Sequence, residues 1–138
     1  PPRSTLFPYT TLFRSTNFWA TDSCRRYLRP DIVVENSNDG RRYVLDTKWK
    51  DVAGSGPSPS DLQQLFAYSQ FFQSSKNALL YPGRTNNIRQ GQYALTTNWS
   101  DKIQCSVINL GLEPRINNWQ EAIYKTITDW MHDAEVVC

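Results

Sequence analysis

Two short apolar segments, residues 32–34 and 43–45, constrain the fold of this chain more than any other feature. Their β-branched, aromatic and aliphatic residues favour strands. The link between them contains Ser37-Asn38-Asp39-Gly40, residues that tolerate the dihedral angles of a tight turn. The sequence therefore predicts an antiparallel hairpin with its turn centred on Asn38-Asp39.

The register of this hairpin brings three polar side chains together. Pairing about the predicted turn sets Glu35 opposite Arg42 and Asp31 opposite Asp46, and opposed residues share a face with Cβ atoms roughly 4.5–5.5 Å apart. Side chains alternate along a strand, so Lys48 emerges on the same face as Asp46. A shift of one residue would turn Asp31 to the other face. We therefore expect Asp31, Asp46 and Lys48 to converge.

Two carboxylates at that separation favour a bound cation. They repel and desolvate each other unless a positive charge lies between them, and Mg²⁺ accepts one or two carboxylates together with waters and phosphate oxygens. With a neighbouring lysine, such a site suits phosphodiester cleavage. The alternative is that Asp31 only begins a strand while Asp46 and Lys48 form a solvated stripe. The apolar neighbours, which we expect to be buried on both faces, argue against it.

A helix is predicted after the loop at residues 53–59, which is rich in Gly, Ser and Pro. Ser60 is the expected N-cap, and Asp61 lies in the first turn, where the helix dipole favours it. A mostly apolar stripe contains Leu62, Leu65, Phe66, Ser69 and Phe72. Asp61, Gln64 and Tyr68 form a second stripe at its boundary, and the last two can reach a common target. An ordinary amphipathic helix with a boundary tyrosine is the alternative.

These motifs together resemble a known superfamily. Pro30-Asp31, Asp46-Thr47-Lys48 and Gln64-x-x-x-Tyr68 are similar to the PD-(D/E)xK nucleases, in the branch with a Q-x-x-x-Y helix. From about Leu28 to Gly83 the chain resembles the McrC family, the nuclease subunit of the McrBC 5-methylcytosine-directed restriction system. The resemblance implies a restriction-endonuclease-like α/β fold, a central mixed sheet flanked by helices. It also implies Mg²⁺-dependent DNA cleavage, with Mn²⁺ as a possible substitute, alongside an McrB-like GTPase that translocates DNA, in defence against foreign or methylated DNA.

The resemblance also implies roles for individual residues. Asp31 and Asp46 would be metal ligands, and the backbone carbonyl of Thr47 would complete the coordination. Lys48 would orient or activate the attacking water and stabilise developing charge on the phosphate.

Gln64 and Tyr68 would brace the site or contact the DNA backbone. Relatives often supply a further acidic residue from an upstream helix, and no convincing candidate is present, because Glu35 lies at the far end of its strand. Two alternatives stay open: another nuclease of the superfamily, acting in recombination or repair, and an assembly module, catalytically incomplete, that stimulates a partner GTPase.

The first fifteen residues differ from the rest of the chain. Residues 1–15 contain no acidic residue and show no helical or strand periodicity over their length. They resemble translated sequencing adapter, with a short basic arm that grips phosphates through Arg3 and Arg14 as the alternative. We therefore expect an N-terminally truncated nuclease domain at residues 16–138.

Composition fits one small domain. The chain has 138 residues and a formal net charge of +2, which is weaker than the charge expected of a DNA binder that acts alone. It contains no apolar run of about 20 residues, so no membrane span is predicted. Three cysteines without metal spacing favour a reduced, cytoplasmic setting. The lone His132 is expected at the surface, and zinc chemistry is improbable because the chain has no cluster of histidines.

The remaining chain completes an α/β plan. A strand at 77–81, ended by Pro82-Gly83, should run parallel to the strand that contains Asp46. A polar connection at 84–89 and strands at 92–99 and 103–110 should follow. Asn117 or Asn118 should cap a final helix, whose core positions are expected at Trp119, Ile123, Ile127 and Trp130.

Overall fold

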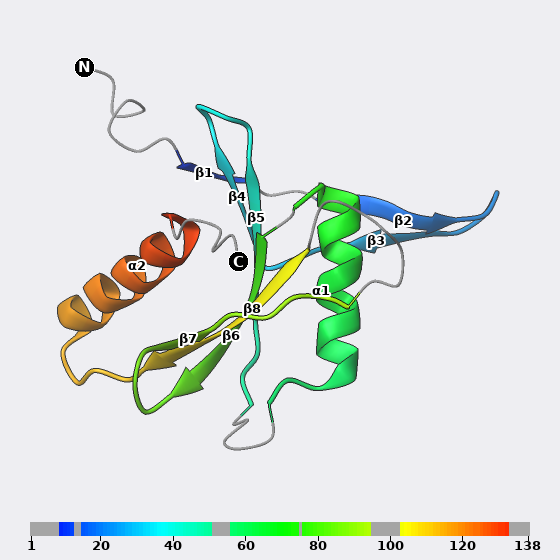
Figure 1. Cartoon of the computed structure of the whole chain (residues 1–138). Coiled ribbons are helices and arrows are strands. Elements are labelled where there is room, and N and C mark those ends of the chain that lie inside the picture. The colour runs from blue at the N-terminus through cyan, green and yellow to red at the C-terminus, as the bar shows by residue number, and fades with distance from the viewer. Residues whose placement is uncertain (1–8, 13–14, 51–55, 75, 95–102, 133–138) are drawn as a thin grey trace.

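A six-stranded mixed sheet with a helix on each face forms the centre of the protein (Figure 1). The computed structural model describes residues 9–12, 15–50, 56–74, 76–94 and 103–132. The strand order is β1-β4-β5-β6-β8-β7. The bounds are β1 Tyr9–Leu12, β4 Ile32–Asn36, β5 Arg42–Thr47, β6 Lys76–Gly83, β7 Asn87–Arg89 and β8 Gln104–Gly111. Helices α1 (Pro59–Phe72) and α2 (Ile116–His132) flank this sheet, and β2 (Thr16–Ala20) pairs with β3 (Arg25–Leu28) separately. The predicted restriction-endonuclease-like α/β fold is confirmed.

The β4–β5 hairpin has the predicted register. Glu35 pairs with Arg42 in the ladder, and their side chains form an ion pair at 2.9 Å. Gly40 has a φ of +73°, which favours glycine, and its N–H donates to the Asn36 carbonyl at 2.8 Å. Continuing the register by one residue beyond the first β4 pair sets Asp31 opposite Asp46.

Alternation along β5 gives each helix its own hydrophobic core. Val44 packs into a cluster with Leu65, Tyr68 and Phe72 of α1, whereas Tyr43 and Leu45 pack into a second cluster with Trp130 and Met131 of α2. Since side chains of like parity share a face, Asp46 lies on the α1 side of the sheet with Val44. The same alternation holds in β8, with Cys105 and Val107 in the first cluster and Ile108 in the second.

Strand β6 is parallel to both neighbours, as predicted for its pairing with β5. The prediction that Pro82-Gly83 ends this strand is wrong, because β6 continues through both residues beside β8. The Lys48 N–H donates to the Leu80 carbonyl, so Leu80 and Pro82 direct their backbone polar groups toward β5. β5 ends at Thr47, opposite Leu80, so the N–H that Pro82 lacks has no ladder partner to satisfy.

Two further boundaries differ from the prediction. Within the described part of the polar connection, Asn87–Arg89 forms β7 against β8, and Gln92 makes only an isolated bridge to Gln104. Residues 95–99 of the strand expected there lie outside the described residues. α2 begins at Ile116, ahead of the predicted Asn117 or Asn118 cap, because the Arg115 carbonyl already accepts the Trp119 N–H.

The α2 face is only partly as expected. Trp130 is fully buried and Ile127 packs beside it, whereas Trp119 and Ile123 are half-buried. Residues 9–12 of the segment set aside as adapter-like form the edge strand β1 on β4. His132 is exposed, as predicted, and its Nε2 lies 2.7 Å from the Tyr9 hydroxyl. Among the described helices, none is long and apolar enough to cross a membrane.

Candidate active site

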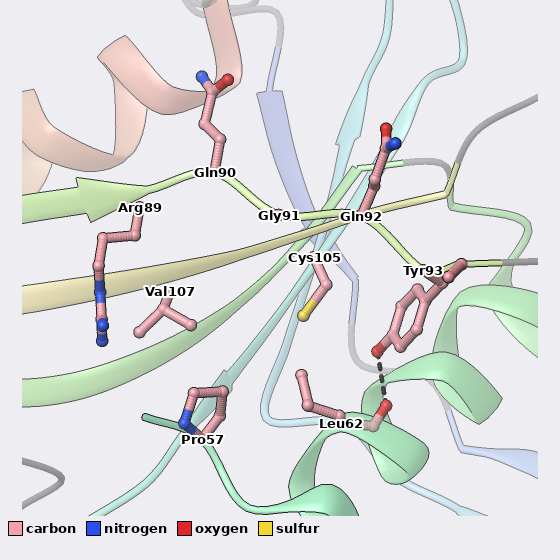
Figure 2. A pocket seen from close by; sticks show the side chains of 10 residues that line it. Pro57, Leu62, Arg89, Gln90, Gly91, Gln92, Tyr93, Cys105 and Val107 are labelled. Carbon is pink, nitrogen blue, oxygen red and sulfur yellow. Dashed lines mark hydrogen bonds between the residues drawn. The ribbon is translucent and has the colours of Figure 1, made fainter. Parts of the chain in front are cut away.

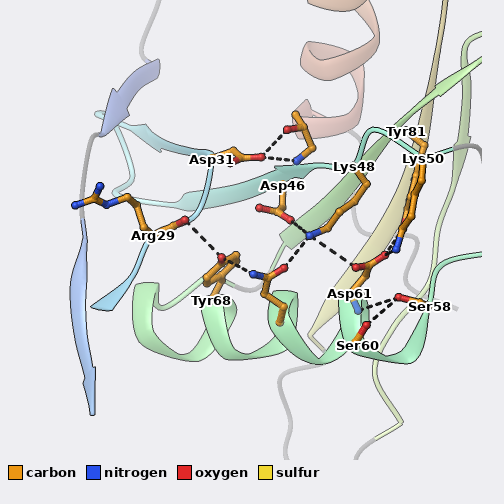
Figure 3. Close-up of polar contacts among 12 residues, drawn as sticks. Arg29, Asp31, Asp46, Lys48, Lys50, Ser58, Ser60, Asp61, Tyr68 and Tyr81 are labelled. Carbon is orange, nitrogen blue, oxygen red and sulfur yellow. Dashed lines mark hydrogen bonds and ion pairs between the residues drawn. The ribbon is translucent and has the colours of Figure 1, made fainter. Parts of the chain in front are cut away.

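Asp31 and Asp46 lie at the same end of the neighbouring strands β4 and β5, where β4 begins and β5 ends (Figure 3). Asp46 is 4% exposed, whereas Asp31, one residue before β4, is exposed. One oxygen of Asp31, Oδ2, accepts the Thr47 N–H at 2.8 Å and the Thr47 hydroxyl at 2.5 Å. Because β4 begins only at Ile32, this side chain takes the place of a ladder partner for Thr47. Asp31 is thereby fixed at the end of the hairpin, beside the Asp46 strand.

Lys48 lies between the sheet and α1. Its Nζ is 2.6 Å from Asp46 Oδ2 and 3.7 Å from Asp61 Oδ1, and it donates to Gln64 Oε1 at 2.7 Å. The Lys48 N–H bonds to the Leu80 carbonyl at 2.8 Å, which fixes the backbone from which this side chain extends. Lys48 and Asp46 are therefore in direct contact, as the predicted hairpin implied.

The helix stripe reaches the same place. Gln64 accepts from Lys48 through its carbonyl oxygen and donates from Nε2 to the Tyr68 hydroxyl at 2.9 Å. The Tyr68 hydroxyl donates in turn to the Arg29 carbonyl at 3.4 Å. This chain of contacts ties the helix to the segment before Asp31, and it uses both ends of the Gln64 amide. Gln64 therefore contacts Lys48 directly and Tyr68 contacts it through Gln64, while their roles in the site stay predictions.

Two more residues complete the cluster and were not predicted as site residues. Asp61, 8% exposed, forms an ion pair with Lys50 at 2.6 Å and accepts from the Tyr81 hydroxyl at 3.2 Å. Asp61 shares the helix stripe of Gln64, three residues along, and Lys50 follows Lys48 at strand spacing. These two spacings are the sequence features from which Asp61 and Lys50 could have been predicted as site residues.

The helix start that presents Asp61 differs from the prediction. Ser58 is the N-cap, and its Oγ accepts the Asp61 N–H at 3.2 Å, whereas Ser60 lies inside the helix. Pro59 occupies the first helical position, where its missing N–H costs nothing.

The pKa values of the two buried carboxyls, Asp46 and Asp61, are shifted in opposite directions. Burial raises the pKa of Asp46, and the negative charge of Asp31 adds to this effect while Lys48 opposes it. Burial alone would also raise the pKa of Asp61, but the hydrogen bonds from Lys50 and Ser58 hold it below the ordinary value. Burial, then the charges of Asp46 and Asp31, raise the pKa of the Tyr68 hydroxyl. Of these two buried carboxyls, Asp46 is the one whose pKa is raised despite its ion pair with Lys48.

The donor set at this end of the hairpin suits a hard divalent cation. Asp46 Oδ2 is buried and accepts no hydrogen bond within the described part of the chain, so its one close polar contact is the Lys48 ion pair. A buried carboxylate is costly unless positive charge lies beside it; Lys48 supplies one such charge here, and a divalent ion would add a second. No group of three His, Cys, Asp or Glu able to hold a metal occurs among the described residues. Two carboxylates with a backbone oxygen still match the ligands of Mg²⁺.

A separate cavity of about 340 Å³ lies beside the first turns of α1, against β8 (Figure 2). Its wall includes the Tyr93 side chain, whose hydroxyl donates to the Leu62 carbonyl at 2.5 Å. Burial raises the pKa of both Tyr93 and Cys105. None of the described residues that line this cavity carries a carboxylate, and none of them belongs to the cluster around Asp46 and Lys48.

One family model matches more than half of this chain, and one solved structure shares its fold. The family model described as "McrBC 5-methylcytosine restriction system component" matches residues 12–82, a range that contains every residue of the site. Among solved structures, the chain is similar to one in a refined half-complex from the tetradecameric assembly of Thermococcus gammatolerans McrB AAA+ hexamers with bound McrC. The TM-score is 0.60 at 16% identity, and the alignment covers 90% of this chain and 29% of that chain. No curated protein matches.

Proposed function

Because the chain belongs to the family of McrBC 5-methylcytosine restriction system components, as its resemblance to McrC predicted, we propose that it is the nuclease module of such a system. It would hydrolyse DNA phosphodiester bonds with a divalent metal ion. The observation that carries this proposal is the arrangement of Asp31, Asp46 and Lys48 at one end of the hairpin, with Lys48 Nζ 2.6 Å from Asp46.

The proposed metal ligands are the carboxylates of Asp31 and Asp46 and the backbone carbonyl of Thr47. Mg²⁺ is the preferred ion, and Mn²⁺ is expected to substitute for it. A divalent ion bound by these oxygens would supply positive charge near the phosphate and lower the pKa of an attacking water.

The chain itself contributes fixed charge and orientation. Lys48 would place its ammonium group against the scissile phosphate, where charge increases during attack. Gln64 keeps that ammonium group beside Asp46, and Tyr68 fixes the Gln64 amide by accepting its Nε2–H. Asp61, together with Lys50, limits how far Lys48 can turn away from Asp46.

The test is cleavage of plasmid DNA in Mg²⁺ by the full chain and three variants. Asp46→Ala and Lys48→Ala should each abolish cleavage while unfolding stays cooperative. Lys125→Ala serves as the matched control, because it removes a lysine from an exposed ion pair on α2. Mg²⁺-dependent cutting that survives in either site variant would refute the mechanism.

The partner and the substrate modification follow from the family. The alignment covers only 29% of the similar solved chain. We therefore propose, and do not take from that structure, that this chain acts with an McrB-like GTPase on methylated DNA. Cleavage that requires GTP, an McrB-like subunit and methylated DNA would support both. Cleavage of unmodified DNA without GTP would instead favour a recombination or repair nuclease of the same superfamily.

One observation favours a second function. The described residues offer two acidic ligands and no group of three, which also fits an assembly module that stimulates a partner GTPase without cutting DNA. Isothermal titration with Mg²⁺ separates the two functions. A site whose affinity depends on Asp31 and Asp46 supports the nuclease, and no such site supports the module.

A further inference from the structure

Strands β2 and β3 form a two-stranded ribbon that extends away from the central sheet past α1 (Figure 1). Its base is attached to the body of the protein at two points. The ring of Phe18, at an irregularity between Asn17 and Trp19, lies 5.5 Å from the ring of Phe71 on α1. Leu28 packs against the core cluster beneath α1. The ribbon is therefore held in a defined direction relative to α1.

The ribbon concentrates positive charge. Residues 15–30 contain Arg25, Arg26 and Arg29 against Asp22 alone, a net +2 that equals the formal net charge of the whole chain. All three arginines are exposed. Among the described residues, no carboxylate lies within ion-pair distance of any of them. The remainder of the chain is electrically balanced, so the excess charge lies on this segment.

The two faces of the ribbon both carry arginine. Arg26 lies opposite Trp19, and Arg25 lies opposite Ala20, so alternation directs Arg25 and Arg26 to opposite faces. Trp19 and Tyr27 are 53% and 55% exposed. A two-stranded ribbon fits the major groove of B-DNA, and arginines on both faces could then reach the phosphates on both walls.

The ribbon is also close to the candidate active site along the chain. β3 ends at Leu28, and Asp31 follows three residues later. The Arg29 carbonyl accepts the Tyr68 hydroxyl, which fixes this connection against α1. Arg26 precedes Asp31 by five residues, so their Cα atoms are at most about 18 Å apart. That span corresponds to about five base pairs of duplex DNA.

We propose that the β2–β3 ribbon binds the phosphate backbone of duplex DNA next to the cleavage site, through Arg25, Arg26 and Arg29. The inference rests on the proposed nuclease function, because DNA is the partner that the neighbouring site would require. Duplex DNA is favoured over a protein partner because the ribbon presents unpaired positive charge on both faces. Phosphates on the two walls of a groove complement this arrangement.

Fluorescence anisotropy with a labelled duplex of about 20 base pairs tests this inference. The measurement uses the full chain in EDTA, so that binding is recorded without cleavage. Arg25→Ala/Arg26→Ala should weaken binding by tens-fold at ~0.1 M salt and reduce the slope of log K against log salt by about 1.8, the value for two phosphate contacts. Arg25→Lys/Arg26→Lys should restore most of the affinity, because lysine also binds phosphate.

The matched control is Arg41→Ala/Arg115→Ala, which removes the same charge from the β4–β5 turn and the start of α2. It should bind DNA like the unmodified chain. Equal affinity of the ribbon variant and this control would overturn the inference, as would a chain that binds no duplex at low salt. A protein partner would be indicated if the ribbon variant kept its DNA affinity but lost association with an McrB-like subunit. Ribbon-dependent binding without cleavage in Mg²⁺ would instead count against the nuclease proposal alone.

Discussion

Replacing Asp61 by asparagine keeps the shape of the side chain and removes its charge. In the structure this carboxylate faces Lys50 at 2.6 Å and Lys48 at 3.7 Å, and it accepts from the Tyr81 hydroxyl at 3.2 Å. An amide oxygen can still accept from Tyr81, but it cannot neutralise the two ammonium groups. Asp61→Asn therefore isolates the electrostatic contribution of this residue to stability.

The contacts set the size of the effect. The Lys50 side chain is 48% exposed, so this pair contributes at the surface scale of about 0.2–1 kcal/mol. Lys48 is largely buried, and losing this charged partner falls in the lower part of the roughly 1–3 kcal/mol range for a buried group that loses a partner, because the two groups are 3.7 Å apart. The expected loss is about 1–3 kcal/mol in the free energy of unfolding at pH 7, or about 4 °C in Tm for each kcal/mol.

The pH dependence gives the sharper test. The pKa of Asp61 is lower in the folded protein than its ordinary value, so the unfolded chain binds more protons over the interval between the two values. Stability from Asp61 is therefore complete above pH ~4 and is lost as the pH falls through the lowered pKa. Asparagine does not titrate, so the difference in unfolding free energy between Asp61→Asn and the unmodified chain should narrow below pH 4.

Urea denaturation followed by circular dichroism at pH 7, 5 and 3 measures this difference. Asp39→Asn is the control, because Asp39 forms an exposed pair with Arg41 at 3.7 Å, and it should change stability by less than about 0.5 kcal/mol. A difference for Asp61→Asn that is as large at pH 3 as at pH 7 would refute the electrostatic account.

Three further substitutions test the site and the fold. Gln64→Ala should slow cleavage about tenfold, the equivalent of ~1.4 kcal/mol, whereas Gln63→Ala on the exposed face of α1 should not slow it. Equal rates of the two variants in kinetic assays would show that Gln64 has no role in cleavage. Ser58→Ala should lower the free energy of unfolding by about 1 kcal/mol, because the helix loses its N-cap. Ser60→Ala should lower it by less than ~0.5 kcal/mol. The reverse order in thermal melts would identify Ser60 as the N-cap. Trp130→Ala should cost about 3–5 kcal/mol in chemical denaturation, because the side chain is fully buried against the sheet; a loss below ~1 kcal/mol would show that α2 does not stabilise this face.

The part of the site that could be predicted from the sequence depends on local rules. Turn residues at Asn38-Asp39-Gly40 fix the hairpin register, and strand alternation then places Asp31 opposite Asp46 without any knowledge of the remaining fold. The spacing of Gln64 and Tyr68 on one helix face is equally local. These features needed only residues close together in sequence, and the structure has the predicted hairpin register and the Gln64–Tyr68 contact.

The features that were missed depend on pairing between distant segments. The edge of β8 is satisfied by Asn87–Arg89, a segment with little strand preference of its own, because an exposed edge offers unpaired backbone groups to any neighbour. The contact of Asp61 with Lys48 and Lys50 requires the parallel crossover from β5 to β6, which brings the first turn of α1 over the end of β5. The β7–β8 pairing has no signal in local periodicity, and the Asp61 contacts follow only when the predicted crossover is combined with the helix stripe.

The contacts of Lys48 connect the structure to the proposed reaction. An ammonium group donates three hydrogen bonds, and its oxygen neighbours here are Asp46 at 2.6 Å, Gln64 at 2.7 Å and Asp61 at 3.7 Å. The contact with Asp61 is the longest, and Lys50 already neutralises the other oxygen of that carboxylate. A phosphate oxygen arriving at Lys48 would therefore displace Asp61 at a smaller electrostatic cost than either other partner. On the proposed mechanism, Lys50 thus stabilises Asp61 while Lys48 is engaged with the substrate, which explains why a second lysine lies so close to the first.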